Sequence, residues 1–220
     1  MKKFINAGLL FGLIFLITGN AWALPIQLTD KVKVGVNGVS YTDGKFFIEN
    51  VTPVTPPQTH SWDKYQAFCL EKSVFFTPGK KYSIDSIEDY VTGGGGGAVN
   101  GQDPLSETTK WLYASYFSGN FSDVTNTQVQ NAIWYEENET TSSTAYSDWF
   151  SLTGGNSQSA LIGWDIKAVN LVEVSSNGYI KDVQSQLIGE YNPVPEPATM
   201  VLFGIGLLGI AGIGRKRTKE

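Results

Sequence analysis

Two side chains in the sequence could together form a covalent bond: the thiol of Cys69 and the carboxamide of Gln130. Cys69 is the only cysteine of the chain and lies in the apolar stretch 65–71, which has the composition of a strand. Gln130 lies in the stretch 127–134, where the spacing of apolar residues indicates a helix. A thiol and an amide that are held in contact can condense to a thioester and release ammonia. An internal thioester is therefore the first hypothesis for this pair.

Cys69 also has other possible roles. A lone cysteine of an exported chain cannot form a disulfide within that chain, so it is an inert buried residue, a link to a second molecule, or a reactive group. A cysteine enzyme would use His60, the only histidine, as its base, and no third residue is placed to orient that histidine. Glu71 should raise the pKa of the thiol, which disfavours a reactive thiolate. One histidine and one cysteine cannot supply the usual metal ligands, so we expect no metal and no cofactor.

A thioester needs contact between its two groups and exclusion of water. Fixed contact replaces a bimolecular encounter, and burial protects the product from hydrolysis. We expect Phe68, Trp134 and Tyr135 to be aromatic walls of such a site. Gln130 lies in the second turn of its predicted helix, where the helix dipole and free backbone N–H groups would stabilise negative charge on the carbonyl oxygen.

The composition indicates one compact extracellular domain. The chain has 220 residues, of which 41% are hydrophobic and 17% charged. A net charge of -5 provides no basic patch, which excludes nucleic acid as a partner. The 24 glycines, together with abundant Val, Thr, Tyr and Phe, favour β-structure with turns.

The N-terminal segment 1–23 has the features of a signal peptide. Lys2 and Lys3 precede the apolar run 4–17, and small residues at 21 and 23 form a cleavage site before Leu24. We expect signal peptidase to remove this segment and the mature chain to be exported.

The C-terminal segment 193–220 has three parts. The first is the stretch Val194, Pro195, Glu196 and Pro197; the second is the uncharged run 198–214; the third is the basic cluster Arg215, Lys216 and Arg217. The run is long enough for a short transmembrane helix, and the basic cluster predicts a cytoplasmic C-terminus. We therefore expect residues 198–214 to hold the domain at the membrane.

This tail resembles the PEP-CTERM sorting signal of Gram-negative bacteria, because the Pro-Glu-Pro triplet, the hydrophobic span and the basic cluster occur in order. The resemblance implies recognition by an exosortase, an intermediate in the inner membrane, and final transfer to the cell surface, the outer membrane or the extracellular matrix. It implies an organism that makes exopolysaccharide. The tail is a sorting signal and carries no information on the activity of the domain.

Residues 24–192 are predicted to form one α+β domain, with a helical insert at about 103–152 between two β-rich halves. Strand patterns occur at 32–36, 45–48, 65–76, 81–91, 166–174 and 179–188. Helix patterns occur at 103–119, where Asp103 and Pro104 provide a start, at 125–137, which has a capping-box spacing, and at 144–152. The five glycines at 93–97 predict a flexible loop, because no Gly-Lys-Ser/Thr follows them.

The pair Phe68-Cys69-Leu70-Glu71 and Gln130-Asn131-Ala132-Ile133-Trp134 resembles the thioester domain of bacterial surface adhesins. The resemblance implies a mainly β barrel or sandwich with an inserted helical subdomain. It also implies a Cys69–Gln130 cross-link in a pocket that includes Phe68, Ala132, Ile133 and Trp134. Gln128, which follows Thr127, is a rival acyl donor.

The leading hypothesis is an exported surface protein that reacts once with an amine or hydroxyl on a surface or matrix partner, as in adhesion or biofilm formation. Such a protein is a covalent binding module and not a turnover enzyme. The alternative is a non-covalent structural or exopolysaccharide-associated protein in which Cys69 is an inert core residue.

Overall fold

The computed structural model describes residues 31–36, 46–50, 64–93, 96–192 and 205. The expected signal peptide 1–23, His60, the sorting motif at 194–197, the basic cluster at 215–217 and, apart from Ile205, the expected span 198–214 lie outside the described residues. Within the described part of the chain, no helix is both long and apolar enough to cross a membrane.

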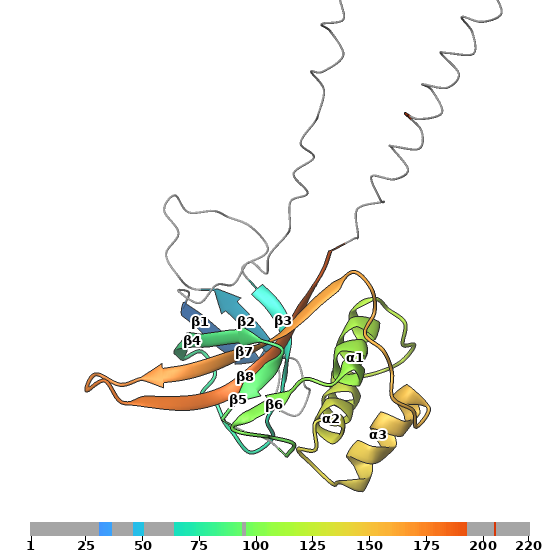
Figure 1. Cartoon of the computed structure of the whole chain (residues 1–220), viewed down its shortest axis with the longest axis horizontal. Coiled ribbons are helices and arrows are strands. Elements are labelled where there is room, and N and C mark those ends of the chain that lie inside the picture. The colour runs from blue at the N-terminus through green and yellow to red at the C-terminus, as the bar shows by residue number, and fades with distance from the viewer. Residues whose placement is uncertain (1–30, 37–45, 51–63, 94–95, 193–204, 206–220) are drawn as a thin grey trace, which may run out of the picture. The chain divides into compact units, whose positions relative to one another are not determined.

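Six antiparallel strands form a curled sheet (Figure 1). They are β1 (Lys31–Val36), β2 (Phe46–Asn50), β3 (Lys64–Cys69), β4 (Lys81–Glu88), β7 (Trp164–Val174) and β8 (Ile180–Tyr191). The strands pair in the order β1-β2-β3-β8-β7-β4, and β1 also pairs with β4, so the hydrogen bonding closes on itself. A curled sheet has an inner and an outer face, and alternate residues of each strand lie on opposite faces.

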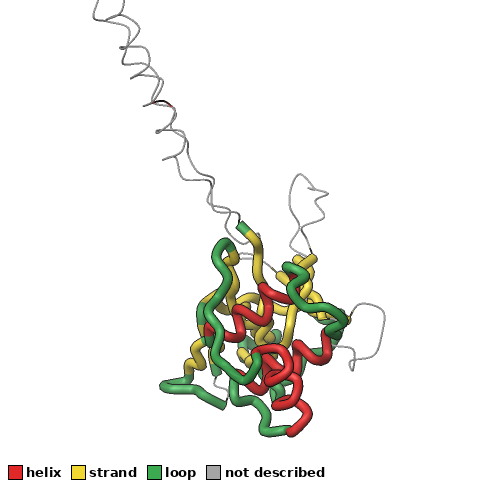
Figure 2. The backbone as a smooth tube through the Cα atoms, turned by 90° about the vertical axis from the view of Figure 1, so that its right-hand side faces the viewer, coloured by secondary structure: helices red, strands yellow, loops and turns green. Residues whose placement is uncertain are grey.

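Three helices pack on one side of the sheet, as the two views show (Figures 1 and 2). They are α1 (Glu107–Phe117), α2 (Asn126–Glu136) and α3 (Ser143–Thr153). A buried cluster between the sheet and the helices contains Phe68, Leu112, Ile133 and Leu187. A second cluster, on the inner face, contains Ala67, Ile188, and Val32 and Val34 of β1. Phe68 and Ala67 therefore lie on opposite faces of β3.

The helix starts follow local capping chemistry. The α2 prediction is confirmed: Thr125 caps the helix, and its reciprocal bonds with Gln128 form the expected capping box. The predicted start of α1 at Asp103 is wrong. Residues Gln102–Pro104 form the short strand β6, which pairs with β5 (Tyr90–Thr92), and α1 begins after Ser106, whose side chain accepts the N–H of Thr109.

Strand β3 is shorter than its sequence pattern predicts. The expectation of one strand over 65–76 is wrong beyond Cys69, where β3 ends. The Lys72 backbone N–H donates to the Glu139 carboxylate at 2.9 Å, which directs the chain toward the end of α2. Cys69 is thus the last residue of its strand. At a coarser level the expected fold class agrees with the structure, which is a strand-rich mixed fold with three helices.

Two glycines of the 93–97 stretch are held by carboxylates, which differs from the predicted flexible loop. Gly96 donates its N–H to Glu139 at 2.8 Å, and a Cβ on Gly96 would lie 2.0 Å from the carbonyl oxygen of Asn138. Gly97 similarly approaches the Asp103 carboxylate. Glycine is required at position 96 because the backbone of the α2–α3 connection passes so close.

Glu137 joins the end of α2 to the start of α1. Its side chain is buried and accepts the Ser106 N–H at 3.1 Å. Burial raises the pKa of Glu137 to about 7; hydrogen bonds from Thr109 and Ser106 oppose that rise, while the charge of Asp103 adds to it. The carboxyl group is therefore partly protonated near neutral pH.

Replacing Glu137 by glutamine keeps an acceptor for Ser106 and removes the ionisation. Because the pKa of Glu137 is raised from 4.5 to about 7 on folding, its stabilising contribution is complete below about pH 4.5 and is lost as the pH rises through about 7. The unfolding free energy of Glu137→Gln, relative to the wild type, should increase by on the order of 3 kcal/mol between about pH 5 and 8. Urea denaturation across this range measures it, and a difference independent of pH would contradict the assignment.

Candidate functional site

Cys69 lies at the end of β3 with its side chain on the inner face of the sheet. Only 1% of the residue is exposed. It is paired with Gln186 of β8, and the next residue, Leu70, donates its N–H to the Ser185 carbonyl at 3.1 Å. Hydrogen-bonded and non-hydrogen-bonded pairs alternate along an antiparallel ladder, so the N–H and C=O of Cys69 point away from β8. These two backbone groups need a partner from another direction.

Gln130 supplies that partner from α2. Its Oε1 accepts the Cys69 N–H at 2.8 Å, and its Nε2 donates to the Cys69 carbonyl at 2.7 Å. The carboxamide thus makes the same two bonds that a neighbouring strand would make, beyond the point where β2 pairs Phe46 with Ala67. Gln130 is 2% exposed. The structure therefore brings the two sequence-predicted residues together through the cysteine backbone.

The carboxamide that contacts the Cys69 sulfur belongs to Gln186. Its Nε2 lies 3.8 Å from Sγ and also donates to the Gln184 carbonyl at 3.3 Å. The residue is fully buried, and its Oε1 has no hydrogen-bond partner. An unpaired buried amide oxygen costs about 1–3 kcal/mol, because its lost hydrogen bond to water is not replaced. Gln186 therefore differs from Gln130, whose oxygen and nitrogen each have a hydrogen-bond partner.

The electrostatic environment keeps the thiol neutral. Burial raises the pKa of Cys69 far above its ordinary value; the hydrogen bond from Gln186 lowers it, and the charge of Glu71 raises it, in the direction expected from the sequence. Burial also raises the pKa of Glu71, whose carboxylate accepts the Ser185 N–H at 2.9 Å. A neutral thiol is a poor free nucleophile, so any reaction here must move the S–H proton directly to a neighbouring group.

A buried polar segment of β8, residues 184–186, lies opposite the end of β3 and includes the Gln186 that contacts the sulfur. Gln184, Ser185 and Gln186 are all buried, although each is polar. The β7–β8 register shifts between the pairs at Val169 and Leu171, which places one extra residue in β8 beside this segment. Bulges of this kind redirect side chains and are frequent near active sites.

Each member of this segment has a specific contact. The Gln184 Nε2 donates to the Glu71 backbone carbonyl, and the Ser185 hydroxyl donates to Asn170 at 2.9 Å. Sequence reasoning missed these residues. The available signal was three consecutive polar residues inside the otherwise apolar strand 183–188, since uncompensated polar residues are unfavourable at buried positions.

The other residues predicted for the pocket lie around α2. Ala132 and Ile133 are fully buried beside Phe68, whose ring contacts Tyr113 edge-on at 6.1 Å. Trp134 is half-buried with the Lys72 amino group 5.8 Å from its ring centroid. Phe68 faces the helices, whereas Cys69 faces the inner side of the sheet, so Phe68 is a wall of the helical core beside the site.

Gln128, the rival acyl donor, is engaged at the start of α2. Its Oε1 accepts the Thr125 N–H and hydroxyl, each at 3.0 Å. Among the described residues, no group of three or more His, Cys, Asp or Glu side chains is arranged to hold a metal ion.

Replacing Gln130 by leucine should leave two buried backbone groups of Cys69 without partners. Each unsatisfied group costs about 1–3 kcal/mol, so the unfolding free energy should fall by about 2–5 kcal/mol. The matched control Gln128→Leu breaks only the capping box and should cost about 1 kcal/mol. Urea denaturation measures both losses, and amide hydrogen exchange should show faster exchange at Cys69 in the first variant alone. Equal losses in the two variants would refute this role.

Comparison with known protein families finds a match for the C-terminal tail of the chain. Residues 193–217 match the PEP-CTERM protein-sorting motif, which confirms the resemblance expected for this segment. No curated protein and no solved structure matches the chain, so the resemblance to thioester domains stays a prediction. The sorting motif indicates exosortase-dependent sorting of a secreted surface protein of the Gram-negative type.

Proposed function

We propose that the domain forms an internal thioester at Cys69 and uses it to attach this surface protein covalently to an amine or hydroxyl on a surface or matrix partner. The observation that carries the proposal is the contact between the Cys69 sulfur and the Gln186 carboxamide at 3.8 Å, in a site where Cys69, Gln130 and Gln186 are each at most 2% exposed. Contact and exclusion of water are the two conditions that a stored acyl bond requires.

Gln186 is the acyl donor that the geometry favours. Its nitrogen contacts the sulfur and its oxygen has no partner, whereas both ends of the Gln130 carboxamide bind the Cys69 backbone. Conversion of an amide to a thioester weakens the carbonyl oxygen as an acceptor, which reduces the cost of leaving it unpaired. In this arrangement Gln130 positions the cysteine. The sequence-based assignment of Gln130 as acyl donor stays a competing prediction.

The proposed thioester formation starts from the neutral thiol and the neutral amide. The Cys69 sulfur attacks Cδ of Gln186, the C–N bond breaks, and the S–H proton leaves with the amide nitrogen as ammonia. In the capture step, an amine of the partner attacks the same carbon, the C–S bond breaks, and the amine proton restores the thiol. The partner is then joined through an amide bond, and the domain reacts once.

The sorting motif indicates where this reaction would take place. Exosortase-dependent sorting brings the chain to the surface, with residues 198–214 proposed as its membrane-spanning intermediate, and a thioester would then fix the exposed domain to a neighbouring molecule. Adhesion and biofilm formation are the processes that such attachment would serve.

A second candidate is a non-covalent surface protein in which Cys69 is inert. The burial of Cys69 and the raised pKa of its thiol favour this alternative equally well. The same two properties count against an enzyme that uses Cys69 as a thiolate with His60 as its base.

Intact-mass spectrometry of the freshly purified full-length chain tests the thioester. We expect a mass that is lower by one ammonia, and a gain of one methylamine after incubation with that amine, with a new free thiol on Cys69. Peptide sequencing should find the methylamide on Gln186. A methylamide on Gln130 would keep the proposed function and overturn the choice of acyl donor.

Two variants serve as controls for this experiment. Cys69→Ala should have the full mass expected from its sequence and should not take up methylamine. Gln184→Met alters the neighbouring buried glutamine and should leave the mass loss intact if Gln186 is the donor. If the wild type has its full mass, and Cys69 is alkylated quantitatively in denaturant, the inert-cysteine alternative replaces the thioester.

A further inference from the structure

A second candidate site lies on the helices, at the end of α2 and on α3. A shallow pocket of about 340 Å³ is lined by Tyr135, Glu136, Asn138, Thr140 and Thr141. Its volume is near the lower end of the range for ligand pockets, about 300–1,000 Å³. Apart from one carboxylate, its polar groups are hydroxyls and an amide.

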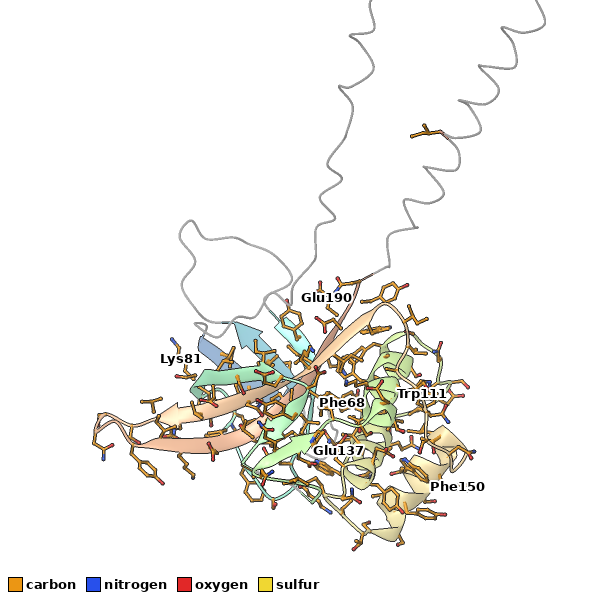
Figure 3. The ribbon with its side chains drawn as sticks, in the orientation of Figure 1. Phe68, Lys81, Trp111, Glu137, Phe150 and Glu190 are labelled. Carbon is orange, nitrogen blue, oxygen red and sulfur yellow. The ribbon has the colours of Figure 1, made fainter. Side chains whose placement is uncertain are left out.

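Beside the pocket, four aromatic side chains form what we call the aromatic platform: Tyr135, Tyr146, Trp149 and Phe150. The Tyr135 ring lies 5.3 Å from both Tyr146 and Trp149, and Tyr146 lies 5.9 Å from Phe150. Tyr146 is 45% exposed and Phe150 is 51% exposed. Figure 3 shows Phe150 on the outer side of α3, away from the strands. Large apolar groups that gather on a surface commonly mark a binding site.

Two residues make the pocket and the aromatic platform one continuous surface. Tyr135 lines the pocket and contacts the rings of the platform. Glu136 also lines the pocket and accepts the indole N–H of Trp149 at 2.7 Å. This bond fixes the orientation of Trp149 relative to the pocket, so the surface is ordered before any ligand binds.

The ring geometry limits the chemistry of the ligand. Because the rings contact one another at centroid distances of 5.3–6.2 Å, no space is left between them for a cation, which excludes an aromatic cage for a quaternary ammonium group. The platform instead offers the exposed parts of the Tyr146 and Phe150 rings. A sugar ring has one C–H surface that stacks on aromatic rings and hydroxyl groups that bond to side chains such as Asn138, Thr140 and Thr141.

The charges nearby favour an uncharged ligand. Glu136, Glu139 and Asp148 lie on or next to this surface, whereas the Lys72 amino group is bound to the Thr140 hydroxyl at 2.8 Å and lies over the Trp134 ring. The excess of carboxylates repels polyanions. We propose that this pocket and the aromatic platform bind a neutral polysaccharide, one or two sugar units in the pocket and the next ones on the rings. The proposal does not rest on the thioester.

Affinity electrophoresis of the full-length chain in mild detergent tests this proposal. The probes are galactomannan, glucomannan, xyloglucan, mixed-linkage β-glucan and dextran in the gel, with alginate as the polyanionic comparison. We expect at least one neutral polysaccharide to retard the protein and alginate to have no effect. Tyr146→Ala and Phe150→Ala, whose side chains are half exposed, should each weaken the retardation about fivefold to tenfold.

The matched control is Tyr179→Ala, which removes an aromatic side chain that is 64% exposed in the turn between β7 and β8. It should retain full binding, and circular dichroism should show the same fold for all variants. The proposal is overturned if no neutral polysaccharide retards the wild type, or if Tyr179→Ala weakens binding as much as Tyr146→Ala. Self-association that depends on Tyr146, measured by sedimentation, together with no retardation, would assign the surface to a protein contact instead.

Discussion

The pair of hydrogen bonds between the Gln130 carboxamide and the Cys69 backbone is the contact on which the site depends. It ties α2 to the last residue of β3, with both bonds under 3 Å and both residues buried. Without it, the end of β3 would carry two unsatisfied backbone groups inside the protein. With it, the direction of the Cys69 side chain is fixed, and the sulfur is held against β8. A helix thereby controls the geometry of a residue in a sheet.

The segment 184–186 of β8 completes the site at an energetic cost. Buried polar side chains lose their contacts with water, and most of those near the sulfur recover them within the protein, through Glu71 and Asn170. The Gln186 Oε1, by contrast, has no hydrogen-bond partner in the part of the protein that the structure describes. The Gln186 oxygen beside the sulfur is thus the polar atom of this segment whose loss of water contacts is not offset within the protein.

Local signals in the sequence predicted much of the fold. Most strands and the three helices depend on residues that are neighbours in the sequence, so their patterns can be recognised from the sequence alone. The capping box at Thr125 and Gln128 is an example. The end of β3 at Cys69 and the pairing of Asp103 within β6 depend on distant partners, Glu139 and Val91, and were not predictable from local patterns. For the site, the sequence drew attention to Cys69 and Gln130. It could not show that Gln186, which lies beside a bulge in β8, contacts the sulfur.

The way Gln130 binds the end of β3 also affects how copies of the protein behave beside one another. An unpaired strand end offers donors and acceptors to any other extended chain, which is a common route to aggregation. Here a single side chain occupies those groups, and it comes from a helix that cannot itself be extended by another strand. Because the Gln130 carboxamide holds both the N–H and the C=O of Cys69, these groups are available to another chain only when α2 has moved away from the end of β3.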